Sequence, residues 1–156
     1  MLFELKPIGI IRSPYASKEE APIQGAFRPE GKGTVEVYPE YMAGLKDIEG
    51  FSHIFLLYPF DRAGEVRMVR KTFLDDDEAH GLFASRHPCR PNGIGLTIVR
   101  LLSRREHILE VGGIDVLDQT PLLDIKPYIP RFDCYPDAQE GWTANKRKRP
   151  KPPGRE

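Results

Sequence analysis

The sequence predicts a single all-β domain, either a closed barrel or a β-sandwich. Short runs rich in β-branched and aromatic residues recur along the chain, and turn-forming residues separate them, as in both architectures. The 14 glycines and 15 prolines are spread over the whole length, which argues against long helices. A chain of 156 residues can bury a core of its own, so we expect it to fold without disulfides or a structural metal.

Five runs have the composition of β-strands. The second run alternates, with Val35 and Val37 on one face, whereas the third is nearly all apolar, as expected of a strand buried on both faces. The polar residues 103–106 separate the last two runs and predict a hairpin loop. Residues 39–45 are compatible with one helical turn, and 64–73 with a helix, a strand or a loop. The five strands are expected at 8–12, 33–38, 51–60, 94–102 and 107–116.

An acidic body and a basic tail share a net charge of zero. Six of the 23 lysines and arginines lie in residues 146–156, together with only one of the 23 acidic residues. We therefore place the folded domain at 1–137 and a basic, proline-rich tail at 138–156. We expect this tail to be disordered in isolation. Alternatively, its charges suit binding to RNA phosphates through counterion release.

Several classes of protein are excluded by the absence of their motifs. No apolar run approaches the roughly 18 residues of a membrane span, and no signal-peptide pattern is present, so we expect a cytoplasmic protein that does not contact membranes. Cys89 and Cys134 are far apart and are expected to be reduced thiols. No metal site is predicted, because the spacing of His80, His87, Cys89 and the acidic run 75–78 fits neither a CxxC nor an HExxH pattern. The glycine-rich loop of a Rossmann fold is also missing.

The densest group of polar residues is 85–95. Two prolines and two glycines restrict the shape of this loop, and Arg86 and Arg90 are four residues apart within it. The planar guanidinium group of arginine suits a carboxylate or a phosphate. We interpret the loop as part of a ligand site. The alternative is a surface turn whose arginines are only solvated.

Two further polar groups accompany it. Residues 118–121, Asp-Gln-Thr-Pro, have the composition of a turn. Asp124 and Lys126 are expected to share one face of a strand with Tyr128 beside them, either as a structural ion pair or, if that face lines a pocket, as an acid–base group. Residues 21–25 form a short loop that offers backbone groups and the Gln24 amide to a ligand.

At these groups the sequence resembles the TsaA-like family, also called TrmO, whose bacterial members are S-adenosylmethionine-dependent methyltransferases that act on tRNA. The resemblance extends from about Pro7 to Phe132 and includes motifs at 8–15, 22–25, 44–53, 86–95 and 118–128. The most diagnostic motifs are Arg90-Pro91-Asn92 followed by Ile94-Gly95, and Asp124-Ile125-Lys126-Pro127-Tyr128.

The resemblance implies a fold, a reaction and a set of site residues. The fold would be a small closed β-barrel without a Rossmann domain, usually a homodimer with its sites near the subunit interface. The substrate would be N6-threonylcarbamoyladenosine next to the anticodon of tRNA, methylated at N6. The residues implied to bind the cofactor, S-adenosylmethionine, are Pro22, Ile23, Gln24, Asp61, Arg62, Arg86, Arg90, Asn92, Asp118, Gln119, Thr120 and Pro121.

Three residues depart from the common pattern of the family. Gly93 stands where proline is common, Gln119 where glycine is common, and Asp61 where histidine is common.

The chemistry of the reaction assigns roles to a few of these residues. A carboxylate such as Asp118 or Asp124 would favour binding of the cationic sulfonium. Because N6 bears a carbonyl and is a poor nucleophile, a base that accepts its proton would accelerate transfer, and we expect Asp124, with Tyr128, to act there. Arg86 and Lys126 are expected to bind the threonyl carboxylate.

Two alternatives remain open at the level of the sequence. The barrel could be a non-catalytic module that binds RNA or a nucleotide. It could also be a methyltransferase whose acceptor is a metabolite or a protein.

Overall fold

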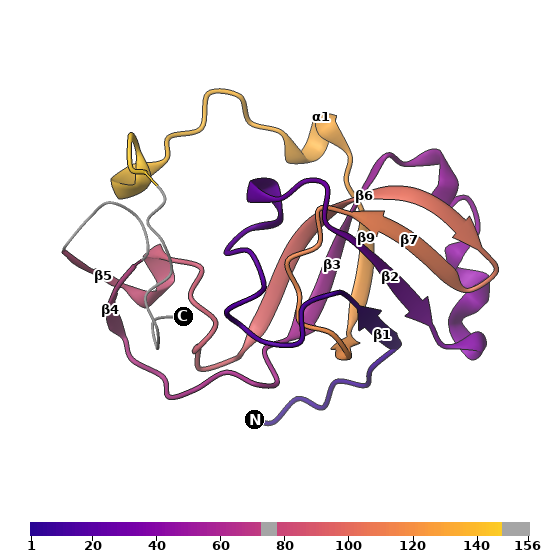
Figure 1. Ribbon diagram of the computed structural model, residues 1–156, viewed down its shortest axis with the longest axis horizontal. Coiled ribbons are helices and arrows are strands. Elements are labelled where there is room, and N and C mark those ends of the chain that lie inside the picture. The colour runs from indigo at the N-terminus through magenta and orange to yellow at the C-terminus, as the bar shows by residue number, and fades with distance from the viewer. Residues whose placement is uncertain (73–77, 148–156) are drawn as a thin grey trace.

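The computed structural model describes residues 1–72 and 78–147, and it confirms the all-β prediction (Figure 1). Seven strands form one sheet in the order β8-β1-β2-β7-β6-β3-β9, and all of its pairs are antiparallel. The helical elements are short; α1 spans only Pro130–Asp133. The strands are β1 (Gly9–Arg12), β2 (Lys32–Val37), β3 (His53–Pro59), β6 (Ile94–Arg105), β7 (Ile108–Gly112), β8 (Thr120–Leu122) and β9 (Asp124–Pro127).

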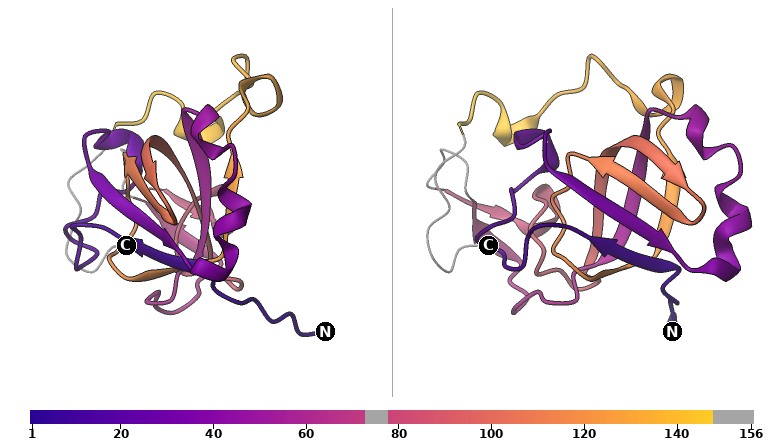
Figure 2. Two further views of the ribbon diagram at one scale, coloured as in Figure 1. Left: turned by 90° about the vertical axis from the view of Figure 1, so that its right-hand side faces the viewer. Right: turned by 45° about the vertical axis from the view of Figure 1, so that its right-hand side comes forward.

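The two end strands of this order, β8 and β9, are consecutive in the chain and close the sheet into a barrel. Only Leu123 separates them, and its amide donates a hydrogen bond to the carbonyl of Leu57 at 2.8 Å. Because β8 pairs with β1 while β9 pairs with β3, one continuous segment joins the two sides of the sheet. Closure leaves few unpaired strand edges, and Figure 2 shows the strands wrapping around a common interior.

Inward-facing side chains from every strand of the barrel fill this interior. Val35 and Val37 of β2 are buried, as the alternation in the sequence predicts. The opposite face of β2 is polar and carries the ion pair between Glu36 and Arg12 of β1, at 2.9 Å. The fully buried core residues include Ile11, Val35, Ile54, Leu56, Val99, Leu109, Val111, Ile114 and Leu122.

Two details of the sequence-based prediction are wrong. The apolar run at 51–60 forms β3, but β3 is not buried on both faces: Ile54, Leu56 and Tyr58 are buried, whereas the residues between them are partly exposed on the outer wall. A barrel has a single interior, so only one face of a strand can enter it. The hairpin loop is also shorter than expected, because β6 continues to Arg105 and the turn lies at residues 106–107.

A small second sheet is inserted between β3 and β6. It pairs β4 (Val69–Lys71) with β5 (Ala79–Gly81), so the ambiguous stretch 64–73 contributes a strand. Near it, the ring of Trp142 stacks on His80 with centroids 3.9 Å apart, and Trp142 Nε1 donates to the carbonyl of Ala84 at 2.8 Å. The C-terminal segment thus contacts the chain that leads into β6.

The structure describes the basic tail only in part. Residues 148–156 of this tail lie outside the described residues, and the end of the folded domain at residue 137 stays a prediction. The predicted turn at 39–45 is a 3-10 helix, Pro39–Leu45. Among the described residues, no helix has the length and apolar character needed to span a membrane.

Replacing Gly9 with alanine should weaken the closing region of the barrel. A Cβ at Gly9 would collide with the backbone carbonyl oxygen of Glu36 on the neighbouring strand, which cannot move without disturbing the β1–β2 pairing. We expect Gly9→Ala to lower the free energy of unfolding by about 1–3 kcal/mol in chemical denaturation.

Gly44→Ala is the matched control, because no atom lies within 4 Å of the Cβ that it would add. Its stability should equal or slightly exceed that of the wild type, since alanine restricts the unfolded chain. Equal stability of the two variants would contradict the close approach of β1 and β2.

Candidate functional site

The loop at 22–24 and the polar loop at 85–95, called the arginine loop from here on, are joined directly by a pair of side chains. Arg86 Nη1 donates a hydrogen bond to Gln24 Oε1 at 2.9 Å, across 62 positions of sequence. The other end of the Gln24 amide donates to the carbonyl of Ile23 at 2.9 Å, which turns Oε1 toward the arginine. Pro22 is buried, whereas Arg86 is exposed and free to reach a bound molecule. Two of the loops that the sequence singles out therefore form one surface.

A second arginine joins the end of β3 to the turn at 118–121. Arg62 Nη2 donates to Thr120 Oγ1 at 2.7 Å and to the carbonyl of Asp118 at 3.0 Å. Its Nε lies 3.3 Å from Asp61 Oδ1. Thr120 Oγ1 in turn donates to the carbonyl of Leu117 at 2.7 Å, so the hydroxyl is fixed by a donor and an acceptor. The segment 61–62 is thereby held against the start of β8.

The turn itself depends on a left-handed residue and on a carboxylate contact to the segment after β1. Gln119 has a φ of 64°, a conformation that glycine adopts at little cost. This gives a physical reason for the glycine that is common at this position in the family. Asp118 Oδ1 accepts a hydrogen bond from the amide of Ser13 at 3.0 Å, and the Asp118 amide donates to the carbonyl of Tyr15 at 2.8 Å. Asp118 thus holds the end of β1 against the turn.

Arg90 shapes the arginine loop from within. Its Nη1 donates to the carbonyls of Leu82, Ser85 and His87 at 3.2, 2.9 and 3.2 Å. Asn92 is exposed, and its carbonyl accepts the amide of Ile94 at 2.7 Å at the entry to β6. These contacts present Arg86 in a defined place. Direct binding of a cofactor by Arg90 and Asn92 stays a prediction.

The acid–base candidates lie on the outer wall of the barrel. Asp124 and Lys126 share one face of β9, as expected, and form an ion pair at 2.8 Å with both side chains partly exposed. The ring of Tyr128 packs 5.6 Å from that of Phe55 on β3. Desolvation raises the pKa of Tyr128, and so do neighbouring Cys134 and Asp133, which favours the neutral phenol. Within 1–72 and 78–147, no hydrogen bond joins Asp124, Lys126 or Tyr128 to the loops described above.

One carboxylate in this region, at the start of the polar group that includes 118–121, was assigned no role from the sequence. Asp115 follows the buried Ile114, and its Oδ2 accepts a hydrogen bond from the amide of Gly25 at 2.9 Å, directly beside the 22–24 loop. Burial raises the pKa of Asp115, whereas the side chain of Thr97, the Gly25 amide and the charge of Arg86 act in the opposite direction. The available signal was an acidic residue between two apolar ones, Ile114 and Val116, in a run expected to be a strand.

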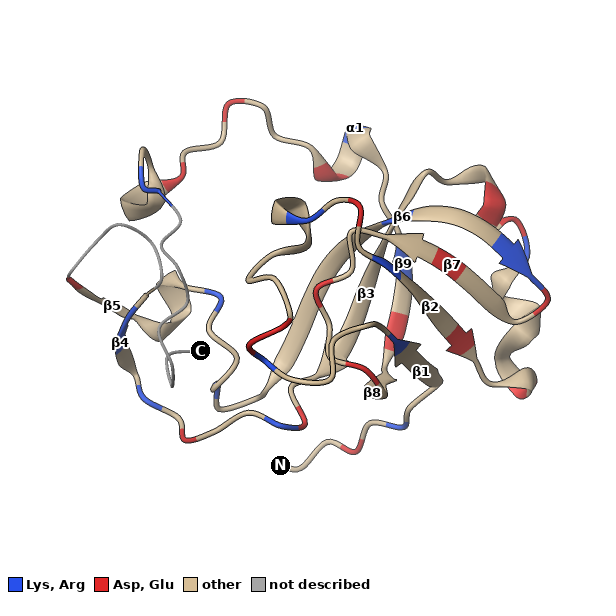
Figure 3. Ribbon diagram, viewed as in Figure 1, with Lys and Arg blue, Asp and Glu red and all other residues tan. Residues whose placement is uncertain are grey.

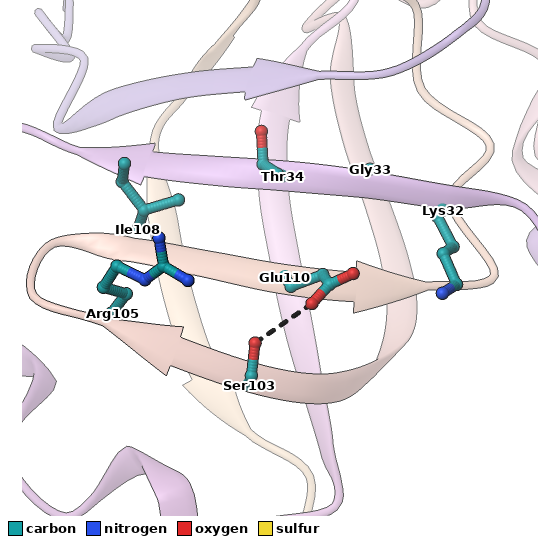
Figure 4. A pocket seen from close by; sticks show the side chains of 7 residues that line it. All are labelled: Lys32, Gly33, Thr34, Ser103, Arg105, Ile108 and Glu110. Carbon is teal, nitrogen blue, oxygen red and sulfur yellow. Dashed lines mark hydrogen bonds between the residues drawn. The ribbon is translucent and has the colours of Figure 1, made fainter.

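A hollow of about 380 Å³ lies elsewhere on the outer wall (Figure 4). It is formed by strands β2, β6 and β7, and Glu110 within it accepts a hydrogen bond from Ser103 at 3.1 Å. None of the site residues named from the sequence lines it. Its lining residues are Lys32, Gly33, Thr34, Ser103, Arg105, Ile108 and Glu110.

Within residues 1–72 and 78–147, no group of three or more His, Cys, Asp or Glu side chains is placed to hold a metal ion. Residues 75–77 of the acidic run weighed in the sequence lie outside the described residues.

Comparison with known proteins finds relatives along most of the chain. A probable S-adenosyl-L-methionine-binding protein of Pyrococcus abyssi is 49% identical over 88% of this chain and 74% of its own length. The tRNA (adenine(37)-N6)-methyltransferase of Escherichia coli is 34% identical over 90% of this chain and 64% of its own length.

The crystal structure of TrmO from Pseudomonas aeruginosa superposes with a TM-score of 0.77 at 38% identity. It matches 90% of this chain, which spans 62% of the crystallised chain.

A family model described as the tRNA-methyltransferase O N-terminal domain matches residues 10–134. This range includes the barrel strands from Ile10 onward, the arginine loop and the Asp124–Tyr128 motif. It also includes the 22–24 loop and the turn at 118–121, whose geometry is given above. The chain therefore belongs to the family of the tRNA-methyltransferase O N-terminal domain.

Proposed function

We propose that this chain is an S-adenosylmethionine-dependent methyltransferase that methylates N6 of N6-threonylcarbamoyladenosine next to the anticodon of tRNA. The observation that carries the proposal is the hydrogen bond between Arg86 and Gln24, which unites two loops that the family resemblance assigns to the cofactor. Membership of the family and the name of the Escherichia coli relative support the reaction. Because the chain spans 64% of that relative, the activity of the whole relative is proposed here for the shorter chain.

The loops offer complementary groups to S-adenosylmethionine, which supplies a methyl group on a cationic sulfur. Arg86 presents an exposed guanidinium that suits the carboxylate of the amino-acid part. The carboxylate of Asp118 contributes negative charge at the turn, where it suits the sulfonium. Arg62 keeps this turn in place through Thr120, so the loops need little reorganisation when the cofactor binds.

For the methyl acceptor, the residues of β9 have the required chemistry. The N6 lone pair of the substrate is delocalised into the carbonyl, so a base that accepts the N6 proton would accelerate transfer by about 10²–10⁴-fold. We assign this role to Asp124, whose orientation is fixed by Lys126 and by the amide of Ile125 at 2.9 Å. Tyr128 would donate a hydrogen bond nearby. Lys126 and Arg86 would bind the threonyl carboxylate.

We further propose that the active form is a homodimer. The first three outward-facing side chains of β6 are apolar: Ile94, Leu96 and Ile98 are 49, 55 and 44% exposed. In Figure 3 this strand is tan over most of its length. Leu57 of β3 pairs with both Leu96 and Asp124, so the catalytic candidates border this apolar face. If a second copy covers the face, the outer wall of one subunit is brought toward the loops of the other.

The partner that carries the substrate would be tRNA, and the expected compartment is the cytoplasm. The last described residues, Lys146 and Arg147, are exposed, and Trp142 anchors the preceding segment near the arginine loop. From there the basic residues of the tail can follow tRNA phosphates.

A binding function without catalysis is the second candidate. It is favoured by the names of the archaeal relatives, which mention only S-adenosyl-L-methionine binding. Incubation with labelled cofactor and tRNA that carries or lacks the threonylcarbamoyl group separates the two. Methyl transfer to N6 only in the modified tRNA supports the proposal. Cofactor binding without transfer to any tRNA would overturn it.

Arg86→Met should weaken cofactor binding. S-adenosylmethionine at a hundredfold excess over Kd should stabilise the wild type by about 2.7 kcal/mol, measured as a rise in Tm. Because the variant lacks a charged hydrogen bond, its Kd by calorimetry should rise by about tenfold or more. Arg67→Met is the control, since Arg67 is an exposed arginine that lies 3.7 Å from exposed Glu65 and takes no part in the loop contacts described above. Equal Kd values for the two variants would contradict a role of Arg86.

Asp124→Asn should separate binding from chemistry. The amide keeps the shape of the side chain but cannot accept a proton, so single-turnover methyl transfer should fall by about 10²-fold or more. Affinities for cofactor and tRNA should stay within a few-fold. Glu36→Gln, which alters another ion-paired carboxylate on the outer wall, should leave the rate unchanged. A wild-type rate for Asp124→Asn would exclude Asp124 as the base.

Ile98→Glu should convert the dimer to a monomer, because a dimer interface would bury the new charge without a partner. The measurement is the molar mass from light scattering during size-exclusion chromatography. Val69→Glu places the same charge on an exposed aliphatic position of β4 and should leave the mass unchanged. A monomeric wild type would contradict the proposed dimer, as would a dimer that persists in Ile98→Glu.

A further inference from the structure

Asp115 is a half-buried carboxylate in the connection between β7 and β8. Its neighbours Ile114 and Val116 are 0 and 3% exposed and belong to the core, which fixes the backbone on both sides of it. Asp115 Oδ1 is buried without a hydrogen-bond donor within bonding distance in the described part of the chain. A carboxylate in this environment loses much of its hydration.

The other oxygen of Asp115 holds the 22–24 loop. Oδ2 accepts the amide of Gly25 at 2.9 Å, across 90 positions of sequence. The backbone at Gly25 lies so close to Gly113 that a Cβ there would collide with the Gly113 carbonyl oxygen. The carboxylate therefore fixes a backbone contact that already has no room for a side chain.

The charge of Asp115 also acts on its surroundings. Arg86, which donates to Gln24, is close enough to lower the pKa of Asp115 against the opposing effect of burial. Burial together with the charge of Asp115 raises the pKa of Tyr58, so the phenol stays neutral. Arg86 is thus a nearby cation, and both Asp115 and Arg86 contact the same loop, through Gly25 and Gln24 respectively.

We propose that Asp115 is a positioning residue of the cofactor site, whose charge orients Arg86 while its Oδ2 fixes the loop at 22–24 through Gly25. This inference rests on the proposed function, since the loops and Arg86 are taken to bind S-adenosylmethionine. It adds a carboxylate outside the motifs that the family resemblance supplied. If the side chain at position 115 served stability alone, a neutral group would stabilise the fold more than a carboxylate does.

The thermal stability of an Asp115→Asn variant distinguishes a positioning role from a merely structural one. Burial raises the folded-state pKa of Asp115 above its unfolded value, so the charged form costs stability at neutral pH, and stability is regained as pH falls through the folded-state value. Asparagine keeps an oxygen for the Gly25 amide and removes the charge. We therefore expect Asp115→Asn to have a Tm at pH 7 equal to or above that of the wild type.

Cofactor binding should change in the opposite direction. Without the charge, Arg86 is no longer held beside Gln24, so the Kd for S-adenosylmethionine should rise by about tenfold or more. The KM for the cofactor should rise accordingly, while kcat changes less, because Asp115 acts on the binding loops. A merely structural carboxylate would lower the Tm and weaken binding together.

Asp133→Asn is the matched control. Asp133 Oδ2 also accepts a backbone amide, that of Ile129 at 2.8 Å, but on the exposed helix α1. Thermal denaturation and calorimetry on the full chain give the two readouts for each variant. A rise in Kd confined to Asp115→Asn, with Tm retained, supports the proposal. An unchanged Kd overturns it, as does a joint loss of Tm and affinity.

A wild-type chain that fails to bind S-adenosylmethionine would instead overturn the proposed function itself. That result is distinguishable, because it is obtained before any variant is made.

Discussion

Closure of the barrel by residues 120–127 is the constraint on which the rest of the structure depends. This one segment pairs with β1 at its start and with β3 at its end, and without it the sheet would have two open edges. The same segment begins with Thr120, which Arg62 holds, and continues to Asp124 on the outer wall. The segment that completes the fold therefore also carries part of the candidate site.

A change of face occurs within this segment. Thr120 and Leu122 of β8 point into the core, and so does Ile125 of β9, so the inward set passes from even to odd positions at Leu123. This change directs Asp124 and Lys126 outward, next to Leu57 and Phe55. A regular strand would have continued with position 124 facing inward, where a paired charge is costly.

The three arginines of the site have different structural roles although their residue type is the same. Arg90 donates to three carbonyls of its own loop, Arg62 fastens two separate segments, and Arg86 is an exposed residue that contacts the 22–24 loop. The first two supply rigidity, which lowers the entropy lost when a ligand binds. Asp115 adds a half-buried carboxylate that holds Gly25, next to the loop that Arg86 contacts.

The sequence by itself determined the all-β class, the positions of the main strands and the loops that carry polar residues. Period-two alternation and turn composition are local properties, so Val35, Val37 and the pair Asp124–Lys126 could be assigned to shared faces. Only the tertiary structure decided which face is the interior, since alternation leaves the two faces equivalent. It also decided the partners of Arg86 and Asp115, which lie 62 and 90 positions away in the chain, because contacts between distant segments, such as the pairing of β2 with β7, bring them together.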